Sequence, residues 1–159
     1  MVKSYPLELV SADGVSIPAT AYVSTTPIPG SVWRDVVVRV EWSSGEAAGT
    51  GCDAFDALRA VREQLAAPGL VPRCFGACRN FVMSPMASQM GSGLVGHLVQ
   101  LGHPAGKGMA GTFDTGPDMD LASIAEQEAF KDAWFGSLGL AGQTVRCTRP
   151  VGHLGFPQA

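Results

Sequence analysis

Charged side chains are scarce in this chain of 159 residues: they make up 16% of it, and the formal net charge is −3. The lysines and arginines are scattered. No basic run is therefore present that would neutralise a row of backbone phosphates, and we expect no nucleic-acid partner.

Long apolar runs are also missing. Residues 1–6 carry one positive charge, but Glu8, Ser11 and Asp13 interrupt the segment that follows, so it has no apolar core of a signal peptide. The apolar stretches at 36–40 and 94–101 are much shorter than the roughly 20 residues that span a bilayer. The sequence therefore predicts a soluble, cytoplasmic protein with no membrane partner.

Recognisable cofactor motifs are absent as well. The glycine-rich segments 91–93 and 102–108 lack the strand, the spacing and the following Ser or Thr of a Walker A loop, and no dinucleotide-binding fingerprint occurs. Asp114, Asp118 and Asp120 lack the spacing and the closing glutamate of an EF-hand. No cofactor is predicted.

The cysteines are few, and a reducing cytosol would keep them as free thiols. Cys74 and Cys78 suggest a zinc site together with the three histidines, but a structural zinc site usually shows a second close pair. We predict no metal site and free thiols that pack as small core residues. The residues concerned are Cys52, Cys74, Cys78 and Cys147, with His97, His103 and His153.

What the sequence does contain is the patterning of a single α+β domain over residues 1–159. Strands are predicted at 7–10, 15–23 and 36–42, with a hairpin turn at Asp13-Gly14 between the first two. Pro18 cannot donate a ladder hydrogen bond, which predicts an edge or bulge position for the second strand. Apolar and charged residues alternate in 36–42, which predicts a central strand.

Three helices are predicted after these strands. The first begins at the N-cap Asp53 and ends before Pro68, and its apolar face includes Arg62. A short second helix begins with Ser84-Pro85, and a third follows the capping box at 123–126. The connecting segments are predicted as a loop at 43–51, an extended segment at 71–83 broken at Gly76, a strand at 94–101, a loop at 102–120 that reaches the core through Met109 and Phe113, and an edge strand at 144–147. The predicted fold is thus an antiparallel sheet packed by two to three helices, with long Gly/Pro-rich loops.

The segment 79–88 is the candidate ligand site. Arg79 and Asn80 precede a predicted helix N-terminus, whose free N–H groups and dipole favour an anion. Arg79 would hold a carboxylate or phosphate, with Asn80, Ser84 and Ser88 beside it. In the alternative interpretation Ser84 only caps the helix, and Arg79 pairs with an acidic residue such as Asp114 or Glu126.

Two classes of function remain open. No nucleophile, base and orienting group occur together in one motif, so a binding protein that recognises a partner protein or a small anionic ligand is the first hypothesis. The alternative is a small enzyme in which Arg79 holds an anionic substrate and Cys78 or His97 is the reactive group, because a neighbouring arginine stabilises a thiolate. The sequence leaves the oligomeric state open.

The exposure of four large apolar side chains is a further test of the binding hypothesis. Trp33 and the methionines Met83, Met86 and Met90 are most simply core residues. If they are exposed, they would instead contact a partner.

From 53 to 138 the chain contains, in order, the runs FDALRAVR, CRN, SPMASQMG and EQEAF. In these features it resembles a group of small uncharacterised bacterial proteins, and in size and style it is similar to the immunity proteins of bacterial polymorphic toxins. The resemblance implies a bacterial cytosolic origin and a toxin-neutralising role, and it supplies no catalytic residue. The mild acidity of the chain would suit a basic toxin.

Overall fold

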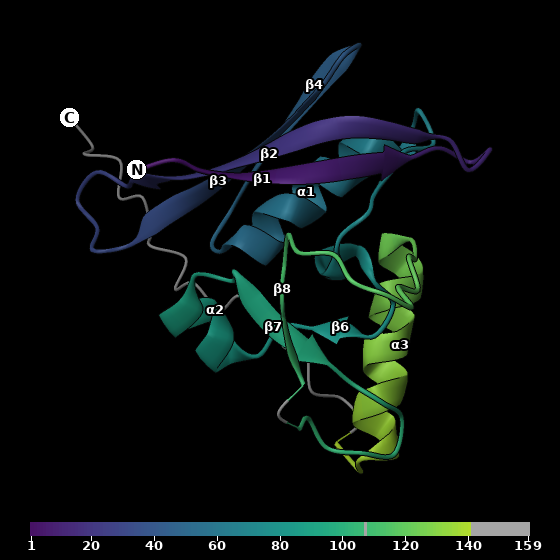
Figure 1. Cartoon of the computed structure of the whole chain (residues 1–159). Coiled ribbons are helices and arrows are strands. Elements are labelled where there is room, and N and C mark those ends of the chain that lie inside the picture. The colour runs from purple at the N-terminus through teal and green to yellow at the C-terminus, as the bar shows by residue number, and fades with distance from the viewer. Residues whose placement is uncertain (107, 141–159) are drawn as a thin grey trace.

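A computed structural model describes residues 1–106 and 108–140 (Figure 1). Two antiparallel sheets and three helices confirm the predicted α+β fold. The first sheet holds β1 (Lys3–Val10), β2 (Ser16–Pro27), β3 (Arg34–Trp42), β4 (Gly45–Gly51) and β5 (Val71–Pro72); the second holds β6 (Phe81–Val82), β7 (Val95–Leu98) and β8 (Met109–Gly111). The helices are α1 (Ala54–Ala66), α2 (Pro85–Gly91) and α3 (Ile124–Ser137), with a short 3-10 turn at Phe75–Ala77.

The first sheet has the strand order β4-β3-β2-β1-β5. Its first hairpin turns at Gly14, whose φ of +78° suits glycine, so the predicted Asp-Gly hairpin is confirmed. The central position of β3 is confirmed too, but β2 is also an inner strand, so the edge position predicted for the second strand is wrong. The pairing of β2 with β3 begins only at Ala19. Pro18 therefore has a strand neighbour on one side only, as it would at an edge.

Strand β4 occupies the segment that we predicted as a loop. It pairs with β3 along its whole length, and α1 packs on it. A Cβ atom on Gly49 would lie 2.5 Å from the carbonyl oxygen of Ala57, and one on Gly51 would lie 2.5 Å from the Ala57 amide nitrogen. The small residues that weaken the strand signal in the sequence are thus the ones that let α1 approach this sheet.

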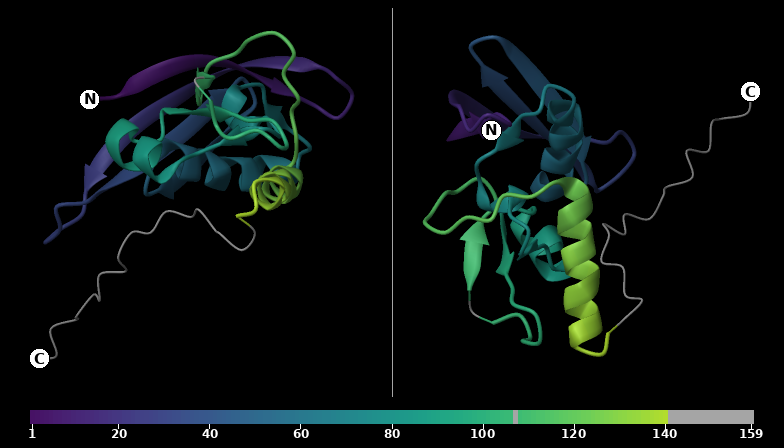
Figure 2. Two further views of the ribbon diagram at one scale, coloured as in Figure 1. Left: turned by 90° about the horizontal axis from the view of Figure 1, so that it is seen from below. Right: turned by 90° about the vertical axis from the view of Figure 1, so that its right-hand side faces the viewer.

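Helix α1 lies between the first sheet and the second half of the chain (Figures 1 and 2). Asp53 caps it as predicted, and its side chain accepts a hydrogen bond from the Asp56 amide. The apolar face packs on the inner face of the first sheet and forms the main core. The fully buried members of this core include Leu9, Val38, Val40, Leu58, Val61 and Leu65.

The second sheet is covered by helices on its two faces. Val82 and Val99 pack with Trp134 and Phe135 of α3, whereas Phe81 packs in a separate cluster with Cys78 and Met83, to which α2 contributes Ala87. Strand β7, which ends at Leu98, confirms the middle of the strand predicted at 94–101, and the caps of α2 and α3 are confirmed. The predicted loop 102–120 contains β8, and of its two expected core residues Phe113 is buried but Met109 is exposed. The prediction for 144–147 lies outside the described residues.

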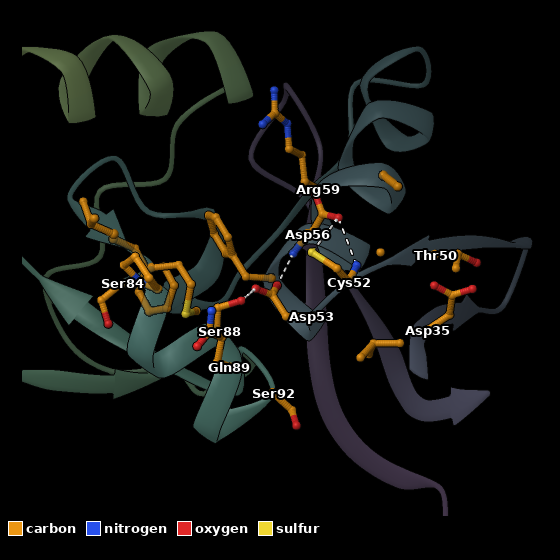
Figure 3. A pocket seen from close by; sticks show the side chains of 18 of the residues that line it. Asp35, Thr50, Cys52, Asp53, Asp56, Arg59, Ser84, Ser88, Gln89 and Ser92 are labelled. Carbon is orange, nitrogen blue, oxygen red and sulfur yellow. Dashed lines mark hydrogen bonds between the residues drawn. The ribbon is translucent and has the colours of Figure 1, made fainter. Parts of the chain in front are cut away.

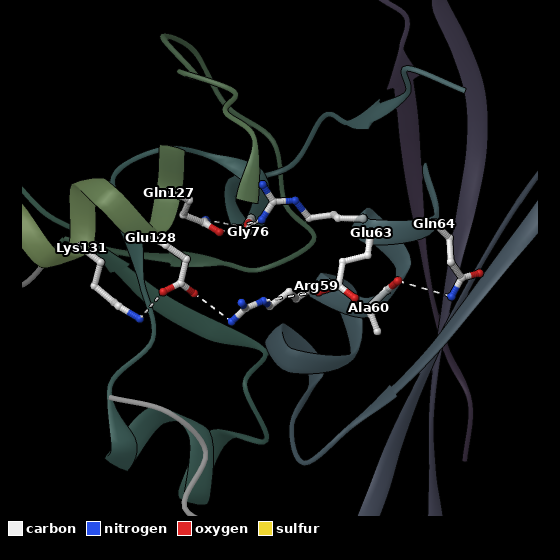
Figure 4. A network of polar contacts seen from close by, with 9 residues as sticks. Arg59, Ala60, Glu63, Gln64, Gly76, Gln127, Glu128 and Lys131 are labelled. Atoms are coloured by element: carbon white, nitrogen blue, oxygen red, sulfur yellow. Dashed lines mark hydrogen bonds and ion pairs between the residues drawn. The ribbon is translucent and has the colours of Figure 1, made fainter. Parts of the chain in front are cut away.

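A buried polar network joins α1, the 3-10 turn and α3 (Figure 4). Arg62 is only 5% exposed. Its guanidinium donates to Gln127 Oε1 at 2.7 Å and to the Ala122 carbonyl at 2.8 Å, and Gln127 Nε2 donates to the carbonyls of Gly76 and Cys78 at 3.0 and 2.8 Å. Because these partners lie in three segments, namely α1, the region of the 3-10 turn and the start of α3, the bonds fix how the three segments pack. None of the helices in the described part of the chain is long and apolar enough to cross a membrane.

Candidate functional site

A groove of about 800 Å³ opens where α1, α2 and α3 approach the ends of β3 and β4 (Figure 3). Segments that are far apart in the sequence supply its lining. From the ends of β3 and β4 and the residues next to them come Trp33, Arg34, Asp35, Thr50 and Cys52; from α1 and its cap come Asp53, Asp56, Arg59 and Glu63; from the α2 region come Met83, Ser84, Ser88, Gln89 and Ser92; and from α3 come Gln127, Glu128 and Lys131. The volume is within the range of ligand-binding clefts.

Asp53 holds the two sides of this groove together. Its Oδ1 accepts the Asp56 amide at 2.7 Å, and its Oδ2 accepts the hydroxyl of Ser88. The amide of Ala54 also donates to the carbonyl of Ser92, at 2.8 Å. Gly93, at a φ of +70°, passes so close that an added Cβ would lie 2.7 Å from Asp53. These hydrogen bonds and this close contact therefore hold the start of α1 against the end of α2.

The four predicted ligand-binding residues do not line one site. Ser84 caps α2 by accepting the Ala87 amide at 3.1 Å, and both Ser84 and Ser88 line the groove. Arg79 and Asn80 instead line a separate hollow of about 340 Å³ with Asp118 and Asp120. The predicted cluster is thus divided between two places on the surface.

The contacts of Arg79 match the alternative interpretation of the sequence, in which this residue pairs with an acidic side chain. Its Nε donates to Asp120 Oδ2 at 2.9 Å, and its Nη2 lies 3.7 Å from Glu126 Oε2. Glu126 was one of the two partners expected from the sequence. Two carboxylates beside one guanidinium leave this hollow with no excess of positive charge for an anion.

The two proposed reactive groups lie apart. Cys78 is 1% exposed, and its thiol contacts the carbonyl of Cys74 at 3.6 Å. Burial raises the pKa of the Cys78 thiol, and it raises that of Cys74 to about 12, which disfavours the nucleophilic thiolate. His97 is paired with Val82 in the sheet and so shares the face covered by α3, whereas Cys78 packs with Phe81 on the other face.

His97 has one unusual feature: its Nδ1 is buried without a hydrogen-bond partner among the residues that the structure describes. Neighbouring metal ligands are not found beside it. Over the described ranges 1–106 and 108–140, no three His, Cys, Asp or Glu side chains are grouped so that they could hold a metal ion.

The cysteines differ in state. Cys74 and Cys78 are free and buried, as predicted. Cys52 is disulfide-bonded, so the prediction of a free thiol is wrong for this residue. Structural disulfides persist mainly in oxidising compartments. This bond therefore argues against the cytosol, and the cytoplasmic location stays a prediction.

Three large apolar side chains are exposed in or near the groove. Trp33 lines it and is 47% exposed; Met86 and Met90 are 71% and 83% exposed on α2, although they are not among the α2 residues that line the groove. Met83 is buried in the core. The sequence favoured the core for all four residues; this is confirmed for Met83 and wrong for Trp33, Met86 and Met90, which are exposed.

The groove lining is acidic. It contains five carboxylates and three cations, which gives a formal charge of −2. The carboxylates are those of Asp35, Asp53, Asp56, Glu63 and Glu128, and the cations are those of Arg34, Arg59 and Lys131. Sequence reasoning missed this groove because its residues come from four separate segments, and no local pattern connects them.

Comparison with known proteins adds no relative: no family model and no curated protein matches this chain. The resemblance to immunity proteins stays a prediction.

Proposed function

We propose that the chain is a protein-binding domain, and that the groove accommodates a segment of a partner protein. The observation that carries this proposal is a groove that is already formed and contains the exposed side chain of Trp33, with Met86 and Met90 exposed on α2, one of the helices that border it. Folding leaves these large apolar side chains in water, whereas an interface would bury them. Tryptophan is enriched among energetically dominant contacts, and methionine adapts its shape to a partner.

The acidic lining indicates the chemistry of the partner segment. A net charge of −2 on the lining residues favours a segment that presents basic residues together with apolar ones. Neutralisation of a basic bacterial toxin is the concrete form of this proposal that the sequence resemblance suggests. The same charge disfavours a small anionic ligand in the groove, and the carboxylates around Arg79 disfavour one in the neighbouring hollow.

The enzyme hypothesis receives less support. It requires Arg79 beside an accessible Cys78 or His97, but the Cys78 thiol is buried, its burial raises its pKa, and Arg79 already pairs with Asp120. Ser88, a hydroxyl in the groove, is bonded to Asp53. Within the described part of the chain no hydrogen bond joins Ser88 to a histidine base.

The test combines capture with surface variants. The full chain is used to capture partners from a lysate of its source organism, and the captured protein is then purified and titrated against the chain by calorimetry. The variants Met86→Ser, Met90→Ser and Trp33→Ser change the proposed contact surface. Since contacts at the centre of an interface cost more than about 1 kcal/mol when truncated, we expect each variant to weaken binding about fivefold or more.

The matched control is Val15→Ser, because Val15 is an exposed apolar residue at the β1–β2 turn and does not line the groove. This variant should bind like the unmodified chain. A partner whose affinity is unchanged by the Trp33, Met86 and Met90 variants would contradict the proposal, as would a partner that Val15→Ser weakens equally.

A further inference from the structure

We propose that the partner's basic segment binds as an added β-strand along the free edge of β4 and continues from there into the groove. This inference rests on the proposed function and names the mode of binding. Strand β4 lies at one edge of the first sheet (Figure 1), and within residues 1–106 and 108–140 it pairs only with β3. Its other side therefore offers backbone hydrogen-bonding groups to an extended segment.

The hairpin loop between β3 and β4 determines which backbone groups face this edge. The loop consists of residues 43–44, and Trp42 pairs with Gly45. In a two-residue hairpin the closing pair exchanges both of its hydrogen bonds, and along an antiparallel ladder such pairs alternate with pairs whose N–H and C=O groups point away from the neighbour. The groups that point to the free edge thus belong to alternate residues of β4, namely Glu46, Ala48 and Thr50.

A side chain of α1 gives an independent check of this assignment. The Nε2 of Gln64 donates to the carbonyl of Ala48. Because this donor comes from a helix and not from β3, the Ala48 carbonyl is available on the side that faces away from β3. An added strand would replace Gln64 at this acceptor with one of its own amides.

The two edges of the first sheet differ in their protection. At the opposite edge, β5 covers β1 only at Leu9 and Val10, and the uncovered part of β1 contains Lys3 and Pro6. Lysine and proline are residues that keep edge strands from pairing with other chains. Strand β4 contains neither, and its register with β3 is unbroken over 7 residues. An unprotected edge of this kind is suited to strand addition.

The free edge of β4 leads directly into the groove. Thr50 and Gly51, the last two residues of the strand, line the groove together with Trp33. A segment that pairs with β4 as far as Thr50 therefore enters the groove at its end. Backbone hydrogen bonds would contribute affinity along the edge, whereas the groove would select the side chains.

Charge complementarity assigns basic residues to the added strand. Beside the edge, Nη1 of Arg39 lies 2.9 Å from Glu41 and 3.9 Å from Glu46, so one cation faces two carboxylates. The groove lining that follows has a formal charge of −2. Opposite charges on neighbouring strands stabilise their pairing, and like charges destabilise it. An extended segment in which basic and apolar residues alternate fits this surface.

The first experiment uses a capped peptide of alternating lysine and valine, as long as β4, as the probe. Amide hydrogen exchange of the full chain is followed by NMR with and without saturating peptide. We expect exchange to slow about tenfold at the three outward amides, which gain partners, and to stay unchanged at Ala47 and Gly49, which already bond to β3. The outward amides are those of Glu46, Ala48 and Thr50. Absence of binding, or binding that leaves these three amides unchanged, would overturn the proposal.

A peptide of alternating glutamate and valine is the matched control for charge. It has the same length and the same pattern of apolar residues, but it places carboxylates beside Glu46 and the groove. We expect it to bind at least about tenfold more weakly than the lysine peptide. Equal affinities would overturn the assignment of a basic segment.

The second experiment changes the edge itself, and calorimetry measures the affinity for the lysine peptide. Ala48→Pro removes an outward N–H and places a ring on the edge while leaving the bonds to β3; Ala48→Thr keeps the N–H and is the matched control. We expect binding about tenfold weaker in Ala48→Pro and within about twofold of the unmodified chain in Ala48→Thr. Unchanged affinity in Ala48→Pro would overturn the proposal.

Gln64→Ala keeps the test decisive if the proline disturbs the strand. This variant frees the Ala48 carbonyl for the peptide, so we expect binding about threefold tighter. A gain in affinity does not arise from a chain that fails to fold. Weaker binding by Gln64→Ala would overturn the proposal.

Both experiments use a synthetic peptide and no captured partner, so the two proposals fail separately. Outward amides that stay unchanged on binding leave the role of Trp33, Met86 and Met90 in partner binding untouched. Loss of that role leaves the pairing of the lysine peptide with β4 standing.

Discussion

Replacing Gln127 by leucine tests the view that a buried polar network holds α1 and α3 together. The Gln127 side chain accepts one hydrogen bond from the Arg62 guanidinium and donates two, to the carbonyls of Gly76 and Cys78. Leucine fills a similar volume but makes none of these bonds. The guanidinium would lose one acceptor, and two buried carbonyl oxygens would lose a donor.

The expected loss follows from the three bonds. A hydrogen bond to a charged group contributes about 1.5–3 kcal/mol and a neutral one about 0.5–1.5 kcal/mol. One bond of the first kind and two of the second give a free energy of unfolding lower by about 4 kcal/mol. Because domains of this size are stable by only about 5–15 kcal/mol, the variant should unfold at a clearly lower denaturant concentration.

Urea unfolding followed by tryptophan fluorescence measures this loss, with the redox conditions held constant. Gln64→Leu is the matched control: Gln64 lies on the exposed side of α1 and donates to the carbonyl of Ala48, so the change should stay within about 1 kcal/mol. The double variant with Arg62→Met should lose less than the sum of the single variants, since both remove one shared bond. A loss below about 1 kcal/mol in Gln127→Leu would refute the reasoning.

Four other outcomes are expected. Asp53→Ala removes the cap of α1 and the acceptor of a hydroxyl on α2, so urea unfolding should show about 2 kcal/mol less stability, and an unchanged midpoint would speak against its bridging role. Gly49→Val forces α1 away from β4, since the first added carbon lies 2.5 Å from the Ala57 carbonyl; a loss of more than about 2 kcal/mol is expected in the same assay, and full stability would contradict the close packing. Burial raises the pKa of the Cys74 thiol from 9.0 to about 12, so below pH 9 both states keep the proton, and between pH 9 and 12 only the unfolded chain releases it. The thiol therefore lowers stability by about 1.4 kcal/mol per pH unit across that interval, and a Cys74→Ala variant should show a shallower decline in urea midpoint over the same pH series. Iodoacetamide at neutral pH should leave Cys74 and Cys78 unlabelled in the native chain and label both in urea, and rapid native labelling of Cys78 would restore the enzyme hypothesis.

The local signals in the sequence predicted helices well. Asp53, Ser84 and Ser123 each cap a helix by accepting a backbone amide three residues later. These bonds form within one turn of the chain, so the residues that make them stand close together in the sequence. The turn at Asp13-Gly14 was predicted correctly for the same reason.

The first sheet shows where local signals failed. The segment 43–51 has no β-branched pattern beyond Thr50, and its propensity is that of a loop. It becomes β4 because β3 offers a free edge and α1 needs a surface that can be approached closely, as Gly49 and Gly51 allow. The prediction that Met109 reaches the core was also wrong. This residue lies on strand β8, but its side chain is exposed.

The candidate site was predictable only in part. The importance of the region around Ser84 and Ser88 was visible from its helix-start chemistry, and Trp33 and Met86 were recognised as contacts on the condition that they are exposed. Exposure itself depends on which side chains the rest of the fold covers. The pairing of Arg79 with Asp120 joins residues 41 positions apart, so no local pattern could decide it.

By itself, then, the sequence determined the α+β class, the hairpin, the three helices and their caps, because each depends on backbone geometry and bonds between near neighbours. Tertiary structure alone decided the strand role of 45–51, the burial of Cys78 and the partners of Arg79. It also assembled the groove from four segments and placed Cys52 within it. These features depend on distances between residues that only the packed chain brings together, and the long-range contacts that set them leave no period or motif in the sequence.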